Sequence, residues 1–205
     1  MKKGLVLLLV AQAAWGDADL LRSLEKSFSR IQTVQTRFTQ EKMLQVFDRT
    51  IVIEGRLVLE NPDRLAWRID SPIRYVLVLD GDEARQWDEE SGQVQKMKVG
   101  GDPVFEEVLG QIEKWFSGRF AELSEDYEMA VLGRDPLRME FVPRTGSLVG
   151  KAIRRVTVSV RGDFKYVERI AIEDASGDRT TITFHDTVLN APVAAAAWEV
   201  EPQDG

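Results

Sequence analysis

The chain has 205 residues, a formal net charge of −7, one histidine and no cysteine. This length suits one domain with a sizeable core. The acidic balance argues against nucleic acid as a partner and against electrostatic docking on anionic lipid. With no cysteine there is no disulfide framework, and one histidine without cysteine does not favour a zinc site.

The first residues are typical of a secretory signal peptide. Lys2 and Lys3 precede an apolar run over residues 5–10, and Ala14-Trp15-Gly16 fits a small-x-small cleavage site. The run is too short to span a membrane as a helix. We therefore expect residues 1–16 to be cleaved and residues 17–205 to form a single domain. Because no cysteine follows the junction, we expect a soluble product without a lipid anchor.

An amphipathic helix is predicted next, over residues 18–34. Its apolar residues recur at steps of three and four, which is the helical period. They are Leu20, Leu21, Leu24, Phe28, Ile31 and Val34.

The period then changes to two, which predicts successive strands. Apolar residues alternate with polar ones over 51–59 and 65–69, while over 75–79 both faces are apolar because Val76 and Val78 fill the second face. Ser71-Pro72 and Asp80-Gly81 supply turns. Since Asp82-Glu83 follow Asp80-Gly81, we expect that loop to be longer than two residues.

A second helix is predicted over residues 103–120, with Asp102 as its N-cap and Pro103 in its first turn. Its apolar residues are Phe105, Val108, Leu109, Ile112, Trp115 and Phe116. Strands follow over 127–131, 137–142, 153–160, 164–172, 180–184 and 198–200. Because neither helix is placed as a parallel crossover, the pattern favours an α+β fold, with helices against the concave face of a strongly curved antiparallel sheet.

An ordered set of short motifs resembles the outer-membrane lipoprotein carrier proteins, the LolA-like family. The motifs are Phe38-Thr39-Gln40, Gly55-Arg56-Leu57, Pro62 through Trp67, Ser71-Pro72, Asp80-Gly81, Trp87-Asp88 and the ending Trp198 through Pro202. The resemblance implies an open half-barrel whose hydrophobic hollow is covered by a helical lid. It implies a periplasmic carrier in a Gram-negative bacterium, which takes an acylated lipoprotein from an inner-membrane exporter to an outer-membrane acceptor.

On this interpretation the cavity and lid residues bind acyl chains. They are Phe38, Leu57, Leu59, Leu65, Trp67, Ile69, Tyr75, Leu77, Leu79, Phe105, Leu109, Ile112, Trp115 and Phe116. One position departs from the family pattern, because Asn61 stands where the carriers have an arginine that ties the lid to the barrel. Asparagine still offers a hydrogen bond there, without the charge-assisted strength of a guanidinium.

Catalysis is not expected. The single histidine, His185, is next to Asp186, and neighbours on a strand point to opposite faces. The Gly-x-Ser-x-Gly motif of esterases is missing. We expect no cofactor, no metal, no membrane insertion and a monomer. The open alternatives are a carrier of another lipid and a non-transporting periplasmic sensor of the same architecture. A periplasmic hydrolase is the weakest alternative.

Overall fold

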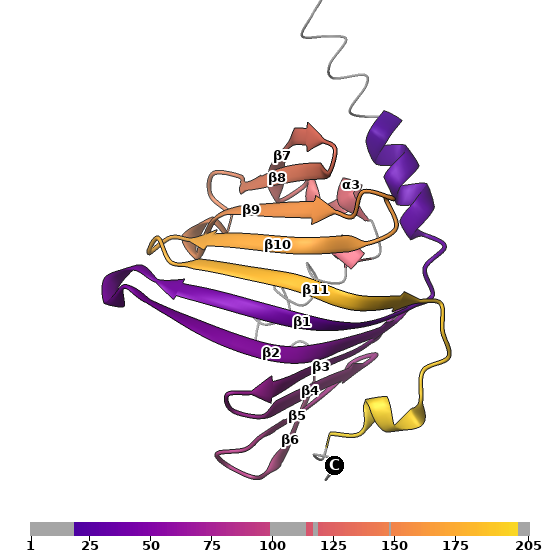
Figure 1. The fold of residues 1–205 in the computed structure, drawn as a ribbon, viewed down its shortest axis with the longest axis vertical. Helices are drawn as coiled ribbons and strands as arrows, with labels where there is room; N and C mark the ends of the chain where they lie inside the picture. The colour runs from indigo at the N-terminus through magenta and orange to yellow at the C-terminus, as the bar shows by residue number, and fades with distance from the viewer. Residues whose placement is uncertain (1–18, 99–113, 117–118, 148, 201–205) are drawn as a thin grey trace, which may run out of the picture.

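The computed structural model describes residues 19–98, 114–116, 119–147 and 149–200. In these residues eleven strands form one open antiparallel sheet, in the order β6-β5-β4-β3-β2-β1-β11-β10-β9-β8-β7 (Figure 1). The strands are β1 (Thr33–Leu44), β2 (Arg49–Glu60), β3 (Arg64–Ser71), β4 (Tyr75–Asp80), β5 (Glu83–Asp88), β6 (Val94–Lys98), β7 (Tyr127–Arg134), β8 (Leu137–Pro143), β9 (Ile153–Val160), β10 (Val167–Asp174) and β11 (Arg179–Leu189). The predicted antiparallel sheet is confirmed.

The helical elements in the described residues are few and short. They are a helix over residues 19–28, η1 (Gln45–Phe47), one turn at residues 114–116, α3 (Phe120–Leu123), η2 (Val149–Lys151) and η3 (Ala195–Trp198). Most of the predicted helix over 103–120 lies outside the described residues, so its role as a lid stays a prediction.

The sheet consists of two runs of consecutive strands that meet at one seam. Among the described strands, β1 and β11 are the paired neighbours that do not follow each other in sequence. Phe38 is opposite Phe184 across this seam, and the register shifts between Gln35 and Arg37.

The N-terminal helix ends earlier than predicted. Leu24, Phe28 and Ile31 are buried as expected, but the helix stops at residue 28 and Val34 lies in β1. Two neighbouring strands bind this segment, because Val34 pairs with Leu59 on one side and with Leu189 on the other. Tertiary pairing therefore overrides the helical spacing at its last position.

Two connections also differ from expectation. The loop after β4 contains only Gly81 and Asp82, because Asp80 pairs with Glu83. Gly81 has φ of 57°, the conformation that a two-residue hairpin turn requires. The strand predicted from residue 164 begins at Val167, since Phe164 has a positive φ of 57° in the turn before it.

A single large core cluster reaches across most of the sheet. It joins Leu57 of β2 and Leu65 of β3 with Leu137 of β8, strands far apart in the sheet order. Such distant strands share one cluster because the sheet curves toward that face, which we call the inner face. The opposite, outer face carries a second cluster of Ala66, Val76, Val78, Trp87, Trp198 and Val200.

The C-terminal segment forms that second cluster instead of the predicted strand over 198–200. Residues 195–198 are the 3-10 helix η3, in a run of four alanines ending at Trp198. Figure 1 shows the chain leaving β11 and returning beside β3–β6. Trp198 is 8% exposed, and the Arg64 guanidinium lies 4.1 Å from the centre of its ring. The segment is therefore held by side-chain packing and not by a strand ladder.

We predict that Trp198→Ala lowers the free energy of unfolding by about 3 kcal/mol, because a large buried aromatic side chain is removed. Urea denaturation followed by far-UV circular dichroism measures this loss. Ala195→Ser, at an exposed position of the same 3-10 helix, is the matched control. Equal urea midpoints for Trp198→Ala and the wild type would show that the segment is not held by this side chain.

Candidate functional site

Three residues of neighbouring strands make the centre of the inner face. Phe38 of β1 is directly opposite Gly55 of β2. The Phe38 ring stacks on the Trp67 ring of β3, with ring centroids 4.1 Å apart and planes 30° from parallel. Phe38 thus reaches across β2 to β3, and it can do so because Gly55 between them has no side chain.

The glycine is required sterically. A Cβ atom built on Gly55 would lie 2.1 Å from the Arg68 carbonyl oxygen and 2.5 Å from Cζ of Phe38. Neither distance is compatible with van der Waals contact. An aromatic ring lying over a strand glycine is a known device for pinning strand register. Two of the short sequence motifs, around Phe38 and Gly55, therefore describe a single packing unit with Trp67.

The other predicted residues on β2 and β3 surround this unit. Leu57, Leu59 and Leu65 are buried in the inner-face cluster, and Trp67, Ile69 and Leu79 pack against it partly exposed. The alternation predicted for these strands is confirmed, because Val76 and Val78 belong to the outer-face cluster instead.

Two predicted residues of β4 lie apart from that cluster. Leu77 is buried, whereas Tyr75 is half-buried and donates a hydrogen bond from its hydroxyl to Oε1 of Gln86 at 3.2 Å. Burial, with a smaller contribution from the Asp88 carboxylate, raises the pKa of Tyr75. The tyrosine therefore stays a neutral donor, as expected for an aromatic side chain at the border of an apolar region.

The residues predicted on the second helix are only partly placed. Phe105, Leu109 and Ile112 lie outside the described residues. Phe116 packs edge-on against Phe184 of β11, with ring centroids 4.9 Å apart. Trp115 is 3% exposed, and its indole N–H has no hydrogen-bond partner within the described part of the chain. Both aromatic residues belong to the inner-face cluster.

Side chains that the sequence pattern did not single out complete the inner face. Phe120 of α3 packs edge-on against Phe28 of the N-terminal helix at 5.9 Å, and it lies 6.3 Å from Phe141 of β8. Phe184 comes from β11, next to β1. Hydrophobicity marks each of them as a core candidate, but the pairing of β1 with β11 is what places Phe184 opposite Phe38.

Asn61 connects the turn before β3 to the chain just after the N-terminal helix. Its Nδ2 donates to the Ile31 carbonyl at 2.6 Å, and its backbone N–H donates to the Gln32 carbonyl at 2.8 Å. The partners described for Asn61 are thus backbone carbonyls, as predicted for a hydrogen-bonding asparagine, but they belong to residues 31 and 32, between the N-terminal helix and β1. A tether from Asn61 to the second helix stays a prediction.

The hydrogen bond described for the His185 ring is made to the neighbouring strand. Its Nε2 is 3.1 Å from the Thr39 hydroxyl of β1, across the seam. Asp186 has a left-handed φ of 51°, so the simple alternation predicted for these two residues is interrupted there. In the described residues no group of three or more histidine, cysteine or acidic side chains is arranged to hold a metal ion. Nor does this part of the chain contain a helix long and apolar enough to cross a membrane.

Comparisons with known proteins agree with this geometry. The family model described as outer membrane lipoprotein carrier protein LolA matches residues 29–201. The outer-membrane lipoprotein carrier protein of Chromohalobacter salexigens is 26% identical over 202 residues, which cover 98% of this chain and 90% of that protein. The protein of the same name from Halorhodospira halophila is 28% identical over 208 residues, which again cover 98% of this chain and 90% of that protein.

Two solved structures show the same fold at low identity. An uncharacterized conserved protein from Thermus thermophilus has a TM-score of 0.56 at 10% identity and covers 92% of this chain and 96% of its own. A DUF1329 family protein from Desulfovibrio piger has a TM-score of 0.51 at 12% identity, and the match covers 88% of this chain and 95% of that protein.

We predict that Gly55→Ala destabilises the protein by about 2 kcal/mol or more, because the new methyl group overpacks the space between Phe38 and the Arg68 carbonyl. Chemical denaturation measures this loss. Gly162→Ala is the control, since a Cβ there meets no atom within 4 Å. The steric account would be refuted by equal stability of the two variants.

Proposed function

This chain belongs to the LolA family of outer-membrane lipoprotein carrier proteins, and we propose on that basis that it is a periplasmic carrier. The acyl chains of a lipoprotein or of another lipid are bound on the inner face and carried from the inner membrane toward the outer membrane. The observation that carries this proposal is the family match over residues 29–201, within which the Phe38–Gly55–Trp67 unit and its apolar surroundings lie.

The proposal includes the compartment and the partners. Residues 1–16 direct export, and residues 17–205 act as one domain and as a monomer. An inner-membrane exporter supplies the cargo and an outer-membrane acceptor receives it. The family is described as a carrier, which fits a binding protein without catalytic chemistry.

The size of the energetic problem explains the apolar inner face. Removing one methylene from water is worth about 0.8 kcal/mol, so a cargo with some thirty methylenes would cost roughly 24 kcal/mol to expose, as an upper bound. A molecule with two or more acyl chains therefore does not leave a membrane unaided at a useful rate. A carrier must offer comparable apolar area and still release it.

In the described residues the protein's own aromatic side chains occupy part of the inner face. Trp115, Phe116 and Phe120 pack into the same cluster as Phe38 and Leu57. Cargo entry on this face requires these side chains to move away. The indole N–H of Trp115 then provides a donor within an otherwise apolar region, where the ester or amide carbonyl of an acyl group can accept it.

Asn61 is proposed to weaken the closed state relative to carriers with arginine at this position. Its side chain makes one described hydrogen bond, to the Ile31 carbonyl. A neutral hydrogen bond is worth about 1 kcal/mol and one from a charged donor about 2 kcal/mol. The difference favours easier opening in this chain and therefore faster release of cargo.

We predict that the protein, purified from periplasm without detergent, carries bound mass in the lipid range. Native mass spectrometry detects that mass. Trp67→Glu abolishes it, because a carboxylate is then placed among Phe38 and the leucines of the inner face. Val52→Glu is the control, since Val52 lies on β2 and is 49% exposed.

A clean apo mass that does not shift when acyl lipid is added would instead support the non-transporting sensor. Circular dichroism of both variants verifies that each is folded, so that loss of lipid is not loss of structure.

We predict that Asn61→Arg slows the release of a fluorescent fatty acid about fivefold, because about 1 kcal/mol is added to the closed state. Stopped-flow fluorescence gives the off-rate. Asp63→Arg introduces the same guanidinium side chain at an exposed position of the same turn and leaves the rate unchanged. An unchanged rate for Asn61→Arg would exclude a tethering role for this position.

A further inference from the structure

The outer face carries a row of basic side chains in direct cross-strand register. Arg37 of β1 is opposite Arg56 of β2, and Arg56 is opposite Arg68 of β3. His185 of β11 is opposite Arg37 at the other end of the row. Neighbouring strands are about 4.8 Å apart, so the three arginines start within about 10 Å of one another. We call these three residues the arginine row.

Like charges at directly opposed positions destabilise a sheet, and only part of this row is neutralised. Arg56 donates two hydrogen bonds to the Asp70 carboxylate, at 2.9 and 3.1 Å. Arg68 donates from Nη2 to backbone carbonyls of the C-terminal segment, including that of Ala197 at 3.1 Å. Burial, followed by repulsion from Arg56, lowers the pKa of Arg68.

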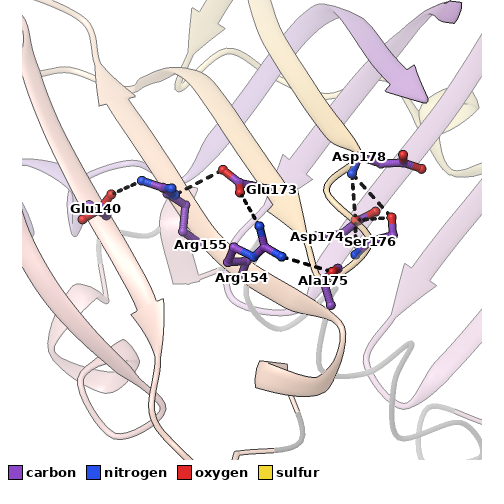
Figure 2. A network of polar contacts seen from close by, with 8 residues as sticks. All are labelled: Glu140, Arg154, Arg155, Glu173, Asp174, Ala175, Ser176 and Asp178. Atoms are coloured by element: carbon purple, nitrogen blue, oxygen red, sulfur yellow. Dashed lines mark hydrogen bonds and ion pairs between the residues drawn. The ribbon is translucent and has the colours of Figure 1, made fainter. Parts of the chain in front are cut away.

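Arg37 has no acidic partner for its guanidinium in the described residues, and it is exposed. Arginines on the other half of the sheet are paired differently. Figure 2 shows Arg155 of β9 between Glu140 and Glu173, at 3.3 Å from each, with Arg154 also bound to Glu173. Arg154 and Arg155 thus share Glu140 and Glu173, whereas in the described residues Asp70 is the carboxylate that hydrogen-bonds a member of the arginine row.

The arginine row borders a hollow of about 670 Å³ on the outer face. Its lining includes four arginines, which are the arginine row and Arg74, and two aspartates, Asp70 and Asp186. The hollow therefore has an excess of positive charge, although the net charge of the chain is −7. Arg74 is paired with Glu89 at 3.0 Å. A neighbouring hollow of about 410 Å³ shares Arg37, Arg56, Asp70 and Asp186 with the first, and Glu54 and His185 also line it.

Beyond the arginine row the lining is partly polar, with Gln35 and Thr36, and partly apolar, with Val188 51% exposed. The same cross-strand line continues from Arg68 to Val76 of β4 and then to Trp87 of β5. Val58 adds to this apolar floor, and Ala196 and Ala197 of the C-terminal segment close one side. Positive and apolar surfaces thus lie next to each other in a space within the size range of small-molecule sites.

We propose that this hollow binds an anionic amphiphile whose phosphate or carboxylate lies on the arginine row and whose apolar part lies against Val58 and Val188. The guanidinium of Arg37 provides paired N–H donors that match the spacing of two oxyanion oxygens. The anion also relieves the repulsion along the arginine row. This site is on the face opposite the proposed cargo site and does not depend on the proposed carrier function.

Isothermal titration of the full-length mature protein with dodecyl phosphate below its micelle concentration tests the proposal. Arg37→Gln weakens binding about tenfold, as expected when a charge-assisted contact is lost. Its folding is expected to be unaffected, because no described contact of this side chain is removed. Arg49→Gln, an exposed arginine of β2 without a described partner, is the matched control and binds like the wild type.

Other probes distinguish the chemistry. Dodecanoate in place of dodecyl phosphate binds with the same dependence on Arg37 if any oxyanion suffices. Equal affinity for inorganic phosphate would overturn the apolar half of the proposal, and equal affinity for dodecyl maltoside would overturn the anionic half. Equal binding of dodecyl phosphate by wild type and Arg37→Gln would place the ligand elsewhere and overturn the site.

Discussion

The stacking of Phe38 on Trp67 across a bare Gly55 is the contact from which the inner face is built. It fixes the register of three strands at once, since the ring of β1 must lie over the glycine of β2 to reach the indole of β3. With that register set, Leu57, Leu59 and Leu65 fall on the same side. A shift of one residue in β2 would turn its leucines to the opposite face.

The sheet divides its chemistry between its two faces. The inner face gathers aromatic and aliphatic side chains into a continuous surface, and the outer face carries charged residues around a smaller apolar cluster. This division explains how an acidic chain presents both a large apolar area and a local excess of arginine. It also explains the place of the C-terminal segment, because Trp198 covers Val76 and Val78, the residues that make β4 apolar on both sides.

Local alternation was sufficient to predict β2, β3 and β4 and to assign their inner-facing residues. It was insufficient for β1, where Arg37, Thr39 and Glu41 make one side polar and a register shift after Gln35 breaks the period. It also could not reveal that Phe184 lies beside Phe38, since this depends on which distant strand pairs with β1. The strand predicted over residues 198–200 is wrong, because the alanine run before Trp198 forms a 3-10 helix and burial of the Trp198 side chain decides the position. Site residues were therefore predictable within a single strand. Contacts between strands from opposite ends of the chain were not predictable.

The seam between β1 and β11 has a consequence for how the chain folds. In the described sheet all the remaining pairings join strands that follow each other in sequence, so each half of the sheet can form from local contacts. Across the seam, in contrast, Thr39 and His185 are 146 residues apart. Contacts of such long range form slowly. β1 is synthesised before all the other strands and β11 after them, so one edge of β1 waits without its hydrogen-bonding partner until the chain is nearly complete. An unpaired edge with an aromatic and aliphatic face is a template for wrong pairing. The order in which the chain emerges, more than the final stability of its core, thus determines how long the nascent protein needs protection from its neighbours.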